Sequence, residues 1–512
     1  MKTAVISALF GAAVAASASD AATPGSDAEH SCCSALATHD ALQGKVLGPD
    51  SDAYNARLKT YYSANAAQKA WCMVLPQSTA DVQALAQIIS SHDCPFGIKA
   101  GAHSAWKGSN GIKNGVTVDL GYMNQTTYNQ ATNVVSIQPG SRWGPVYETL
   151  NQYNVTTVGA RTSVVGVGGF TTGGGYSFHS NAHGLAADMV VNWEIVLANG
   201  TVVNANKDEN ADLWKAQKGG SGNLGFVTRI DQEAIPGTLL WGGFTQYHLK
   251  YTDAVFNAYL NFTEHTEPNT ADQNIVALFY DKINGTGAYA IRSILTNADG
   301  IANRSVFDEY LSIPNLGSTL TVGPESEIIP QFTGPTPLGL YANWFTGMAT
   351  NSIESLKSID ELHKKYVPLM EAAAPDATFN TLIEFQPVTD TMVANGNKRG
   401  GNIMGMEPLV EGGPSLMWLL SLTVDTEEHQ NSILPIARQF IDAINDKQRE
   451  QNTFLNWIYL NYAWEDEAPF KHYGQKNIKL LHDVSRKYDP RGVFQKLRQT
   501  GFKLATPRCP KA

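Results

Sequence analysis

Three stretches of the chain combine closely spaced glycines with polar residues that could bind a ligand. They are residues 99–104 (KAGAHS), 165–175 (VGVGGFTTGGG) and 220–225 (GSGNLG). Because glycine lacks a side chain, its backbone N–H groups can come close to a bound group. The first stretch is typical of a loop that binds an anion. The second is typical of main chain in close contact with a large planar group.

Other signatures of catalysis do not occur in the sequence. It holds no G-x-S-x-G, no H-E-x-x-H and no acidic residues at the spacing of a calcium loop. These motifs are the usual starting points for a hydrolase or a metal site. The sequence therefore predicts an organic cofactor and no metal.

The third stretch matches the G-x-G-x-x-G pattern of dinucleotide-binding folds, but its context is reversed. That fingerprint requires a strand before it and a helix after it. Here a helical segment around residues 212–214 comes first, and a β-run over residues 226–230 follows. This order disfavours an NAD-dependent dehydrogenase, which we keep only as a third hypothesis.

Capping residues and periodicity indicate the elements that position these stretches. Ser78 begins an amphipathic helix that ends near Asp93, and strands over residues 96–98 and 116–120 flank the first stretch. Asn199-Gly200 predicts a two-residue turn between strands 190–198 and 201–204. The second stretch holds too many glycines for a helix, so we expect it to be non-helical.

Beyond Pro236 the glycine-rich pattern ends and a second unit begins. Strand-like segments at 243–249, 288–295 and 416–424 alternate with helices, among them residues 353–366, which have three- and four-residue apolar spacing. The pattern predicts an antiparallel sheet with helices, and residues 330–339 as an irregular insertion. The fold class is α+β.

Charge and hydropathy exclude two kinds of partner. The chain has 512 residues, of which 43% are hydrophobic, and its formal net charge is −10. Without clustered cations it lacks a groove that follows phosphates, so no nucleic acid is expected. No later stretch reaches the roughly 20 apolar residues of a bilayer span, so no membrane is expected either.

The first 18 residues are predicted to be a cleaved secretory signal peptide. Lys2 precedes an apolar run, and Ala16-Ser17-Ala18 is an A-x-A cleavage pattern. In a secreted chain an Asn-x-Ser/Thr sequon can carry an N-glycan if it lies on the surface. Six asparagines start such sequons: Asn124, Asn154, Asn199, Asn261, Asn284 and Asn303.

Secretion also favours disulfides over metal ligation by the five cysteines. Cys32 and Cys33 could tie an N-terminal arm to Cys72 and Cys94, with the pairing left open. Cys509 would then be free or paired between molecules.

Motifs along nearly the whole mature chain resemble the berberine-bridge-enzyme-like branch of the vanillyl-alcohol-oxidase flavoproteins. In the family's order they are residues 99–104, Gly166-Val167-Gly168-Gly169 with Gly173-Gly174-Gly175-Tyr176, residues 219–225, Tyr459-x-Asn461-Tyr462 and Tyr473-Gly474-x-x-Asn477. The resemblance implies FAD as the cofactor. It also implies a p-cresol-methylhydroxylase-type (PCMH-type) FAD-binding domain of two α+β subdomains, and a substrate domain with an antiparallel sheet flanked by helices.

The implied organisation follows the chain in five parts. They are the signal peptide (1–18), the N-terminal arm of the FAD domain (19–66), the PCMH-type FAD-binding domain (67–236), the substrate-binding domain (237–450) and a berberine-like segment that returns to the FAD domain (451–512).

The resemblance further implies how FAD is held. The family's R-x-G-G-H loop bonds the flavin 8α carbon through its histidine, here His103, while Lys99 and Ala102 replace the arginine and the second glycine. Many relatives add a second link through a cysteine at the position of Thr162. A hydroxyl is not a thiolate nucleophile, so a single link is expected. The implied cofactor-binding residues are His103, Lys99, Ala100, Gly101, Ala102, Ser104, Gly168, Gly169, Gly174, Gly175, Gly222, Asn223, Gly225 and Val227.

For proton transfer the resemblance points to Tyr462 and Tyr176, which match positions that face the flavin ring, with Asn461 as a polar neighbour. A tyrosine that acts as a base needs its pKa of about 10 lowered by a cation or by hydrogen bonds, and the sequence does not identify that partner. Glu384 is an alternative base or a solvent-facing carboxylate. His179 and His183 either border the pocket or have structural roles.

The predicted function is that of a secreted FAD-dependent oxidase. It would transfer a hydride from a small alcohol, phenol or secondary metabolite to covalently bound FAD, which O2 reoxidises with release of H2O2. One alternative is oxidative cyclisation or desaturation in a biosynthetic pathway. Another is a flavin-binding glycoprotein without turnover.

Overall fold

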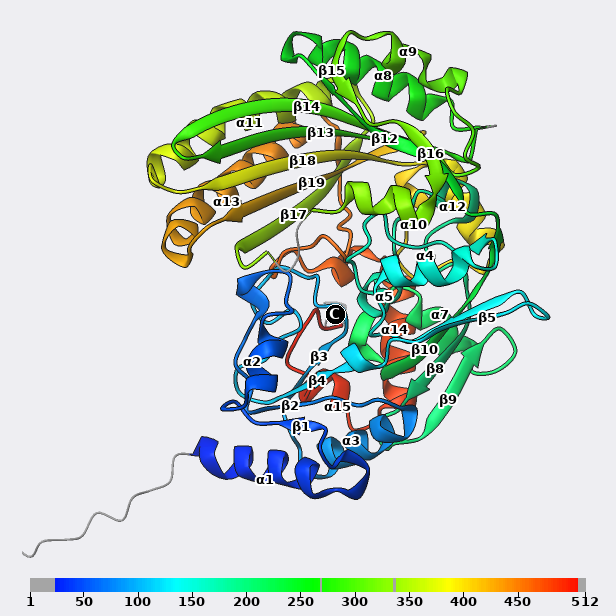
Figure 1. The fold of residues 1–512 in the computed structure, drawn as a ribbon, viewed down its shortest axis with the longest axis vertical. Coiled ribbons are helices and arrows are strands. Elements are labelled where there is room, and N and C mark those ends of the chain that lie inside the picture. The colour runs from blue at the N-terminus through cyan, green and yellow to red at the C-terminus, as the bar shows by residue number, and fades with distance from the viewer. Residues whose placement is uncertain (1–23, 268, 335–337, 505–512) are drawn as a thin grey trace, which may run out of the picture.

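The computed structural model describes residues 24–504, except residues 268 and 335–337. Figure 1 shows a lower part built on two small sheets and an upper part built on one large sheet. The end of the chain, in red, returns to the lower part. The predicted signal peptide and Cys509 lie outside the described residues.

The first sheet carries the first glycine stretch. Its strand order is β1 (Val46–Leu47), β2 (Cys72–Val74), β4 (Val116–Asp119) and β3 (Phe96–Lys99). The last three strands are parallel, and β1 pairs antiparallel with β2. Helix α3 (Thr79–Ser91) starts at the predicted cap, where the Ser78 side chain accepts from the backbone N–H of Asp81. The predicted helix and both strands are confirmed.

Two disulfides fasten the N-terminal helix α1 (Pro24–Thr38) to this sheet. Cys32 bonds Cys94 and Cys33 bonds Cys72, within the set of pairings that the sequence allowed. Helix α2 (Asp52–Leu58) follows and leads into residues 59–66, which run toward the large sheet.

The second sheet is antiparallel, in the order β5 (Thr126–Asn129), β6 (Val134–Ile137), β10 (Phe226–Glu233), β8 (Val190–Val196) and β9 (Val202–Asn206). Gly200, with φ of 82°, turns the chain between β8 and β9 as predicted, but β8 ends at Val196 and β9 begins at Val202, so the connection is longer than the predicted two residues. Helix α7 (Ala211–Gln217) precedes the third glycine stretch and β10 follows it. The reversed G-x-G-x-x-G context is therefore confirmed.

The expectation that the second glycine stretch is non-helical is wrong. Residues Val167–Thr172 form the short helix α5, with Gly166 at its N-cap. A Cβ atom on Gly168 would lie 2.8 Å from the carbonyl oxygen of Pro139. The glycines therefore let this helix lie very close to neighbouring main chain, and that contact outweighs their low helix propensity.

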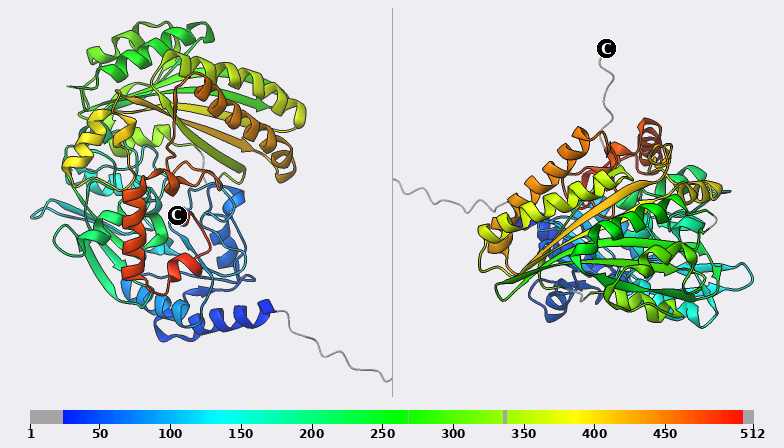
Figure 2. Two further views of the ribbon diagram at one scale, coloured as in Figure 1. Left: turned by 180° about the vertical axis from the view of Figure 1, so that it is seen from behind. Right: turned by 90° about the horizontal axis from the view of Figure 1, so that it is seen from above.

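The upper part is an antiparallel sheet of nine strands, as predicted. Its path is β15 (Asn315–Ser318), β12 (Leu239–Tyr247), β14 (Thr286–Asn297), β13 (Asp272–Ile283), β18 (Phe379–Val388), β19 (Ser415–Val424), β17 (Tyr341–Thr350) and β20 (Phe454–Leu455), and β16 (Thr321–Pro324) also pairs with β12. The long helices α11 (Ile353–Ala373) and α13 (Glu427–Glu450) lie side by side along one face (Figure 2).

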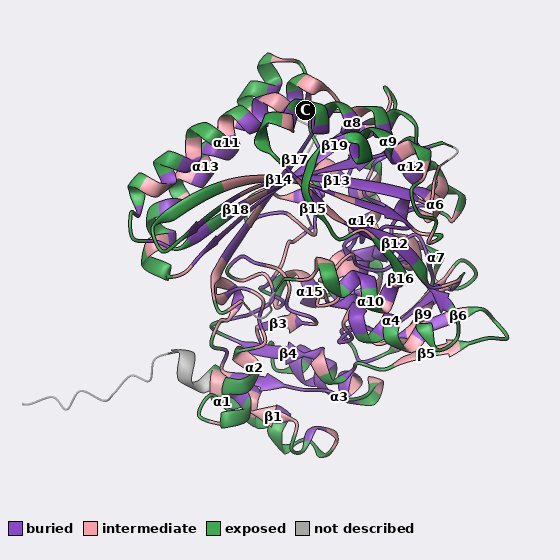
Figure 3. Ribbon diagram, turned by 45° about the horizontal axis from the view of Figure 1, so that its top comes forward, coloured by how far each residue is buried: buried purple, intermediate pink, exposed green. Residues whose placement is uncertain are grey.

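The remaining helices pack around these sheets. They are α4 (Trp143–Asn151), α6 (Ser180–His183), α8 (Thr252–Glu264), α9 (Asp308–Ser312), α10 (Glu325–Ile328), α12 (Asp390–Lys398), α14 (Gln475–Tyr488) and α15 (Val493–Lys496), with a small sheet of β7 (Val155–Thr156) and β11 (Ile235–Pro236). Figure 3 shows that the buried residues concentrate on the strands. Within the described ranges, no helix has both the length and the apolarity needed to cross a membrane.

The last described residues complete the first sheet. The backbone N–H of Phe96 donates to the Leu497 carbonyl at 2.9 Å, and the N–H of Gln499 donates back to Phe96 at 2.9 Å. The Gly501 N–H donates to Gly108, in the loop that follows β3. The C-terminal segment therefore lies against the first glycine stretch.

Candidate active site

The loop after β3 offers a row of unused backbone donors. Among the described residues, no acceptor lies on the backbone N–H groups of residues 101–105. Ala102 has φ of 54°, a conformation that turns successive N–H groups toward one side. Gly101 meets Gly166 so closely that a Cβ on Gly101 would lie 2.2 Å from the Gly166 Cα. This geometry fits a phosphate-bearing ligand.

His103 lies half-buried in this loop, between two aromatic rings. The imidazole stacks on Tyr62 with 4.0 Å between ring centroids, and Trp344 of β17 meets it edge-on at 5.6 Å. Burial and then the positive charge of Arg142 lower the pKa of His103 to about 3. The ring is therefore neutral near pH 7, and a neutral imidazole has a nitrogen lone pair available for bonding.

Lys99 lies at the base of the loop rather than on its surface. Its ammonium is 3.0 Å from the buried carboxylate of Asp119, which also accepts two hydrogen bonds from Arg57. Burial lowers the pKa of Lys99 to about 8, against the effect of Asp119, whose own pKa is lowered by Lys99 and Arg57 despite burial. Lys99 therefore stabilises the loop through its ion pair with Asp119 and is not placed to contact a ligand directly.

The second and third glycine stretches border the same region. Gly169 of α5 is exposed, and a Cβ there would meet nothing within 4 Å. Gly174 and Gly175 have φ of 114° and 85°, which side chains rarely allow.

In the third stretch, Gly225 adopts φ of 153° beside Ile195. A Cβ atom added to Gly222 would lie 3.5 Å from the Arg498 guanidinium. The Asn223 side chain bonds Arg498 and Phe502 internally. Val227 is buried in the core beside β8. The Asn223 side chain is therefore engaged within the protein, and its main-chain carbonyl accepts a hydrogen bond from Gln495.

A polar cluster faces this region from the large sheet. The Tyr462 hydroxyl accepts a hydrogen bond from Arg161 at 2.5 Å and donates to Gln386 of β18 at 3.2 Å. Arg161 also donates to Gln386 at 2.7 Å. Trp344 contacts the Tyr462 ring edge-on at 5.7 Å. Because Trp344 also contacts His103, this cluster and the first glycine stretch belong to one site.

Arg161 is the cationic partner that the sequence does not identify. Burial raises the pKa of Tyr462 above its ordinary value and Glu384 adds to this rise, although the guanidinium of Arg161 and the hydrogen bond with Gln386 act in the opposite direction. No carboxylate among the described residues forms an ion pair with Arg161. Its charge acts both on the phenol and on the nearby carboxylate of Glu384.

Glu384 lies behind this cluster rather than in solvent. It is half-buried, and Gln386 donates to its carboxylate at 2.8 Å. Burial raises its pKa, against the effect of Arg161.

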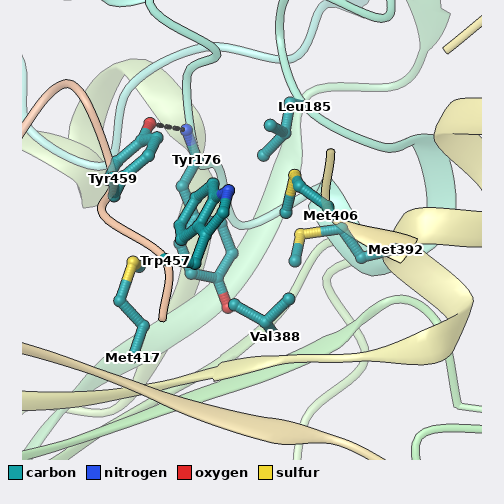
Figure 4. A pocket seen from close by; sticks show the side chains of 8 residues that line it. All are labelled: Tyr176, Leu185, Val388, Met392, Met406, Met417, Trp457 and Tyr459. Atoms are coloured by element: carbon teal, nitrogen blue, oxygen red, sulfur yellow. Dashed lines mark hydrogen bonds between the residues drawn. The ribbon is translucent and has the colours of Figure 1, made fainter. Parts of the chain in front are cut away.

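The polar groups of Tyr176 and Asn461 are hydrogen-bonded to structural partners. The Tyr176 hydroxyl donates to the Pro387 carbonyl at 2.5 Å, and its ring lies 4.5 Å from the Arg161 guanidinium. Asn461 donates to the Phe170 carbonyl and to the Tyr459 hydroxyl. The Tyr459 hydroxyl in turn accepts from the N–H groups of residues 175 and 176 (Figure 4). These residues hold the second glycine stretch in place.

A small apolar cavity lies beside Tyr176, whose ring also contacts Arg161 of the polar cluster. It is lined by Tyr176, Leu185, Val388, Met392, Met406, Met417, Trp457 and Tyr459 (Figure 4). Its volume of about 10 Å³ is too small for an organic substrate.

The two histidines near the second stretch lie apart from this site. His179 is buried and bonds the Glu325 carboxylate of α10, and His183 is near Arg399. These contacts favour a structural role for both histidines over a position at the border of the pocket. No group of three or more His, Cys, Asp or Glu side chains in the described part of the chain is placed to hold a metal ion.

Comparison with known proteins gives relatives over the whole chain. A family model described as an FAD binding domain matches residues 70–206. The chain is 33% identical to the FAD-dependent monooxygenase drtC of Aspergillus calidoustus, over 98% of this chain and 95% of that protein. It is 34% identical to the FAD-dependent monooxygenase sdcF of Emericella nidulans, over 92% and 98%.

Two solved structures share the fold at lower identity. The 6-hydroxy-D-nicotine oxidase of Arthrobacter nicotinovorans has a TM-score of 0.74 at 18% identity, over 92% of this chain and 99% of that one. The glucooligosaccharide oxidase of Acremonium strictum has a TM-score of 0.72 at 19% identity, over 93% and 100%. The α+β architecture expected from the sequence is thereby confirmed.

Proposed function

Because this chain belongs to the berberine-bridge-enzyme-like FAD-linked oxidoreductases, we propose that it oxidises a small alcohol, phenol or secondary metabolite with dioxygen. When bound, FAD accepts a hydride from a substrate carbon and passes two electrons to O2, which gives H2O2. The observation that carries the proposal is the Arg161–Tyr462–Gln386 cluster, which Trp344 links to His103.

The glycine stretches are proposed to bind FAD mainly through main chain. The free N–H groups of residues 101–105 would hold the diphosphate, and Gly168, Gly169, Gly174 and Gly175 would allow the backbone to approach the ring. The third stretch would contact the adenosine side. On this assignment residues 67–236 hold the cofactor, residues 237–450 form the substrate pocket, and the segment from residue 451 returns to the flavin.

His103 is proposed to form the only covalent link, to the flavin 8α carbon. Forming this N–C bond would release one proton from the imidazole nitrogen, one proton from the 8α carbon and two electrons, which O2 would take up to give H2O2. The neutral state of His103, with its pKa lowered to about 3, supports this role. The glucooligosaccharide oxidase is described with a 6-S-cysteinyl, 8α-N1-histidyl FAD, and Thr162 supplies no thiol for a second link.

Tyr462 is proposed to take the hydroxyl proton of the substrate as the hydride leaves. Tyr462 and Arg161 are both half-buried, and Arg161 stabilises the phenolate that accepts the proton. Trp344 and Tyr62 provide flat walls that suit an aromatic substrate. Tyr176 and Asn461 would position the second glycine stretch beside the ring.

Secretion is part of the proposal. The two disulfides are typical of an oxidising compartment. All six sequon asparagines, at 124, 154, 199, 261, 284 and 303, are exposed and so accessible for N-glycans. Expression in a fungal host should release glycosylated protein into the medium, and enzymatic removal of N-glycans should lower its mass. Retention of unmodified protein inside the cells would contradict this part.

The test of the reaction is a single-turnover measurement on the purified yellow protein. Phenols and alcohols are mixed anaerobically with the enzyme, and bleaching of the flavin band is followed. Tyr462→Phe should slow bleaching about 100-fold or more, because a positioned proton acceptor contributes at least that factor. Tyr280→Phe is the matched control, since it removes a hydroxyl that bonds Glu371 elsewhere on the large sheet.

Three outcomes would change the assignment. A yellow protein that no donor bleaches would instead be a flavin-binding protein without turnover. Unchanged rates in Tyr462→Phe would remove that residue from the mechanism. A ring-closed or desaturated product would identify the cyclisation alternative.

The names of the two fungal relatives support a second candidate, a monooxygenase. In that reaction one atom of O2 enters the product and the other becomes water, and two electrons come from the substrate or from an added nicotinamide reductant. Turnover under ¹⁸O2 distinguishes the two reactions. Label in H2O2 alone supports the oxidase, whereas label in the product supports oxygen insertion.

A further inference from the structure

Tyr62, in the segment between α2 and β2, lies flat on the ring of His103. The two ring planes are 22° apart and their centroids are 4.0 Å apart. Trp344 meets both rings edge-on, at 5.7 Å from Tyr62 and 5.6 Å from His103. The imidazole is thus held on one face by a stack and at its edge by an indole.

Hydrogen bonds anchor Tyr62 to both sides of the site. Its backbone N–H donates to the Ala102 carbonyl at 2.9 Å, directly before His103. The next residue, Ser63, exchanges hydrogen bonds with the N–H and carbonyl of Ala342 on β17, the strand that carries Trp344. The position of the Tyr62 ring is therefore set relative to both of its aromatic partners.

His103 forms no hydrogen bond with another described residue. In most sites one ring nitrogen bonds a carbonyl or carboxylate, which sets the ring plane and the tautomer. Here the imidazole bonds the carbonyl of its own residue, no other described residue reaches it, and the neutral ring forms no ion pair. Packing against Tyr62 and Trp344 therefore supplies the contacts from other residues that hold the ring plane.

We infer that Tyr62 is the positioning residue for flavin attachment, because its ring holds the His103 imidazole in the plane from which a nitrogen reaches the flavin 8α carbon. This inference rests on the proposed link at His103. It assigns to the N-terminal arm a role in cofactor attachment, in addition to the substrate wall proposed for Tyr62. The flat face of Tyr62 matters, and its hydroxyl does not.

The experiment follows covalent attachment over time. Flavin-free protein, produced under riboflavin limitation, is incubated with FAD and precipitated with acid at intervals, and the flavin that stays with the polypeptide is measured. Tyr62→Leu should slow attachment about tenfold or more, the effect of losing a ring contact of about 1.4 kcal/mol. Tyr62→Phe should attach at the wild-type rate.

Tyr366→Leu is the matched control, because Tyr366 stacks on Phe440 on the helices of the large sheet, with 5.3 Å between centroids. It removes an equivalent stack and should leave the attachment rate unchanged. If Tyr62→Leu does not fold, Tyr62→Met, which fills similar volume without a flat face, replaces it. Thermal unfolding and total flavin bound before acid treatment are recorded for each variant.

The outcomes separate this inference from the proposed attachment. Acid-stable flavin in His103→Ala would refute the link itself, whatever Tyr62 does. If His103→Ala loses the link but Tyr62→Leu and Tyr62→Met attach flavin at or above the wild-type rate, the positioning role is refuted. Slow attachment in Tyr62→Phe would also refute it, because the hydroxyl would then be the essential group.

Discussion

At the scale of single residues, the site depends on how burial and one cation act on a phenol. Burial raises the pKa of Tyr462 and the adjacent Arg161 opposes that rise. The charge of Arg161 favours the phenolate, whereas the nearby carboxylate of Glu384 disfavours it. This pair decides at which pH the proposed proton acceptor becomes available.

We predict that activity rises with pH as Tyr462 ionises, and that Arg161→Gln moves this rise to higher pH by about one unit or more. Removing a cation that lowers a pKa must raise that pKa, so the variant loses most activity at alkaline pH, where Tyr462 ionises in the wild type. The pH dependence of kcat/KM from neutral pH to the alkaline limit of the enzyme's stability measures this shift.

Arg161→Lys should shift the profile less than Arg161→Gln, since it keeps the charge but not the paired donors. Arg292→Gln is the control, because Arg292 is also half-buried and bonds a glutamine on the same sheet. A profile that is unchanged in Arg161→Gln would show that Arg161 does not act on the phenol.

At the scale of elements, helix α5 is important because it presents bare main chain to the proposed flavin. Gly168 meets Pro139 closely, whereas Gly169 faces open space. The two adjacent glycines therefore have different roles. A glycine at 168 is required by close contact within the protein. A glycine at 169 is required only if a ligand fills the space beside it.

We predict opposite effects of Gly169→Ala on the two forms of the protein. The flavin-free form should gain about 0.4–1 kcal/mol, because alanine is the better helix residue and nothing in the protein obstructs it. Flavin retention should fall, because the new methyl group occupies the ligand's space. Thermal unfolding of the flavin-free form and the flavin-to-protein absorbance ratio are the two measurements.

Gly412→Ala, at another position where an added Cβ meets nothing within 4 Å, should leave flavin retention unchanged. Full retention in Gly169→Ala would place the flavin elsewhere.

Sequence patterns were sufficient for α3, β3, β4 and the order of elements around the third glycine stretch, because those depend on local capping and periodicity. They failed for α5, where close contact between backbones overrode propensity. They also missed Arg161 and Gln386 as partners of Tyr462. These residues are 301 and 76 positions from Tyr462, and no local pattern encodes a contact made only by the tertiary fold.

At the scale of the whole molecule, a buried ion pair joins the lower part to the large-sheet part. His179, just before α6, bonds Glu325 of α10, which also accepts from Thr156 of β7 at 2.5 Å. Although burial disfavours the imidazolium, Glu325 outweighs it and the pKa of His179 is raised. This pair contributes stability while His179 is charged.

We predict that Glu325→Gln destabilises the protein most at mildly acidic pH, by about 3 kcal/mol, since it leaves a buried charge without its partner. The contribution of a raised His pKa is complete below about pH 6.5 and is lost as pH rises through the folded-state value. The gap in unfolding temperature between the wild type and the variant should therefore narrow from pH 6 to pH 9.

Glu327→Gln, on the same short helix but exposed, should show no such trend. A gap that widens with pH would mean that His179 is not the titrating partner.

The segment that pairs with Phe96 comes from residues 497–499, about 400 positions later in synthesis. A ribosome therefore finishes the edge of the first sheet last, and during translation that edge stays unpaired while the rest of the polypeptide emerges. A message truncated just before codon 490 would yield a nascent chain whose earliest sheet has no closing strand. Cellular quality control would meet such a product as an incompletely folded protein, even though nearly all of its length is present.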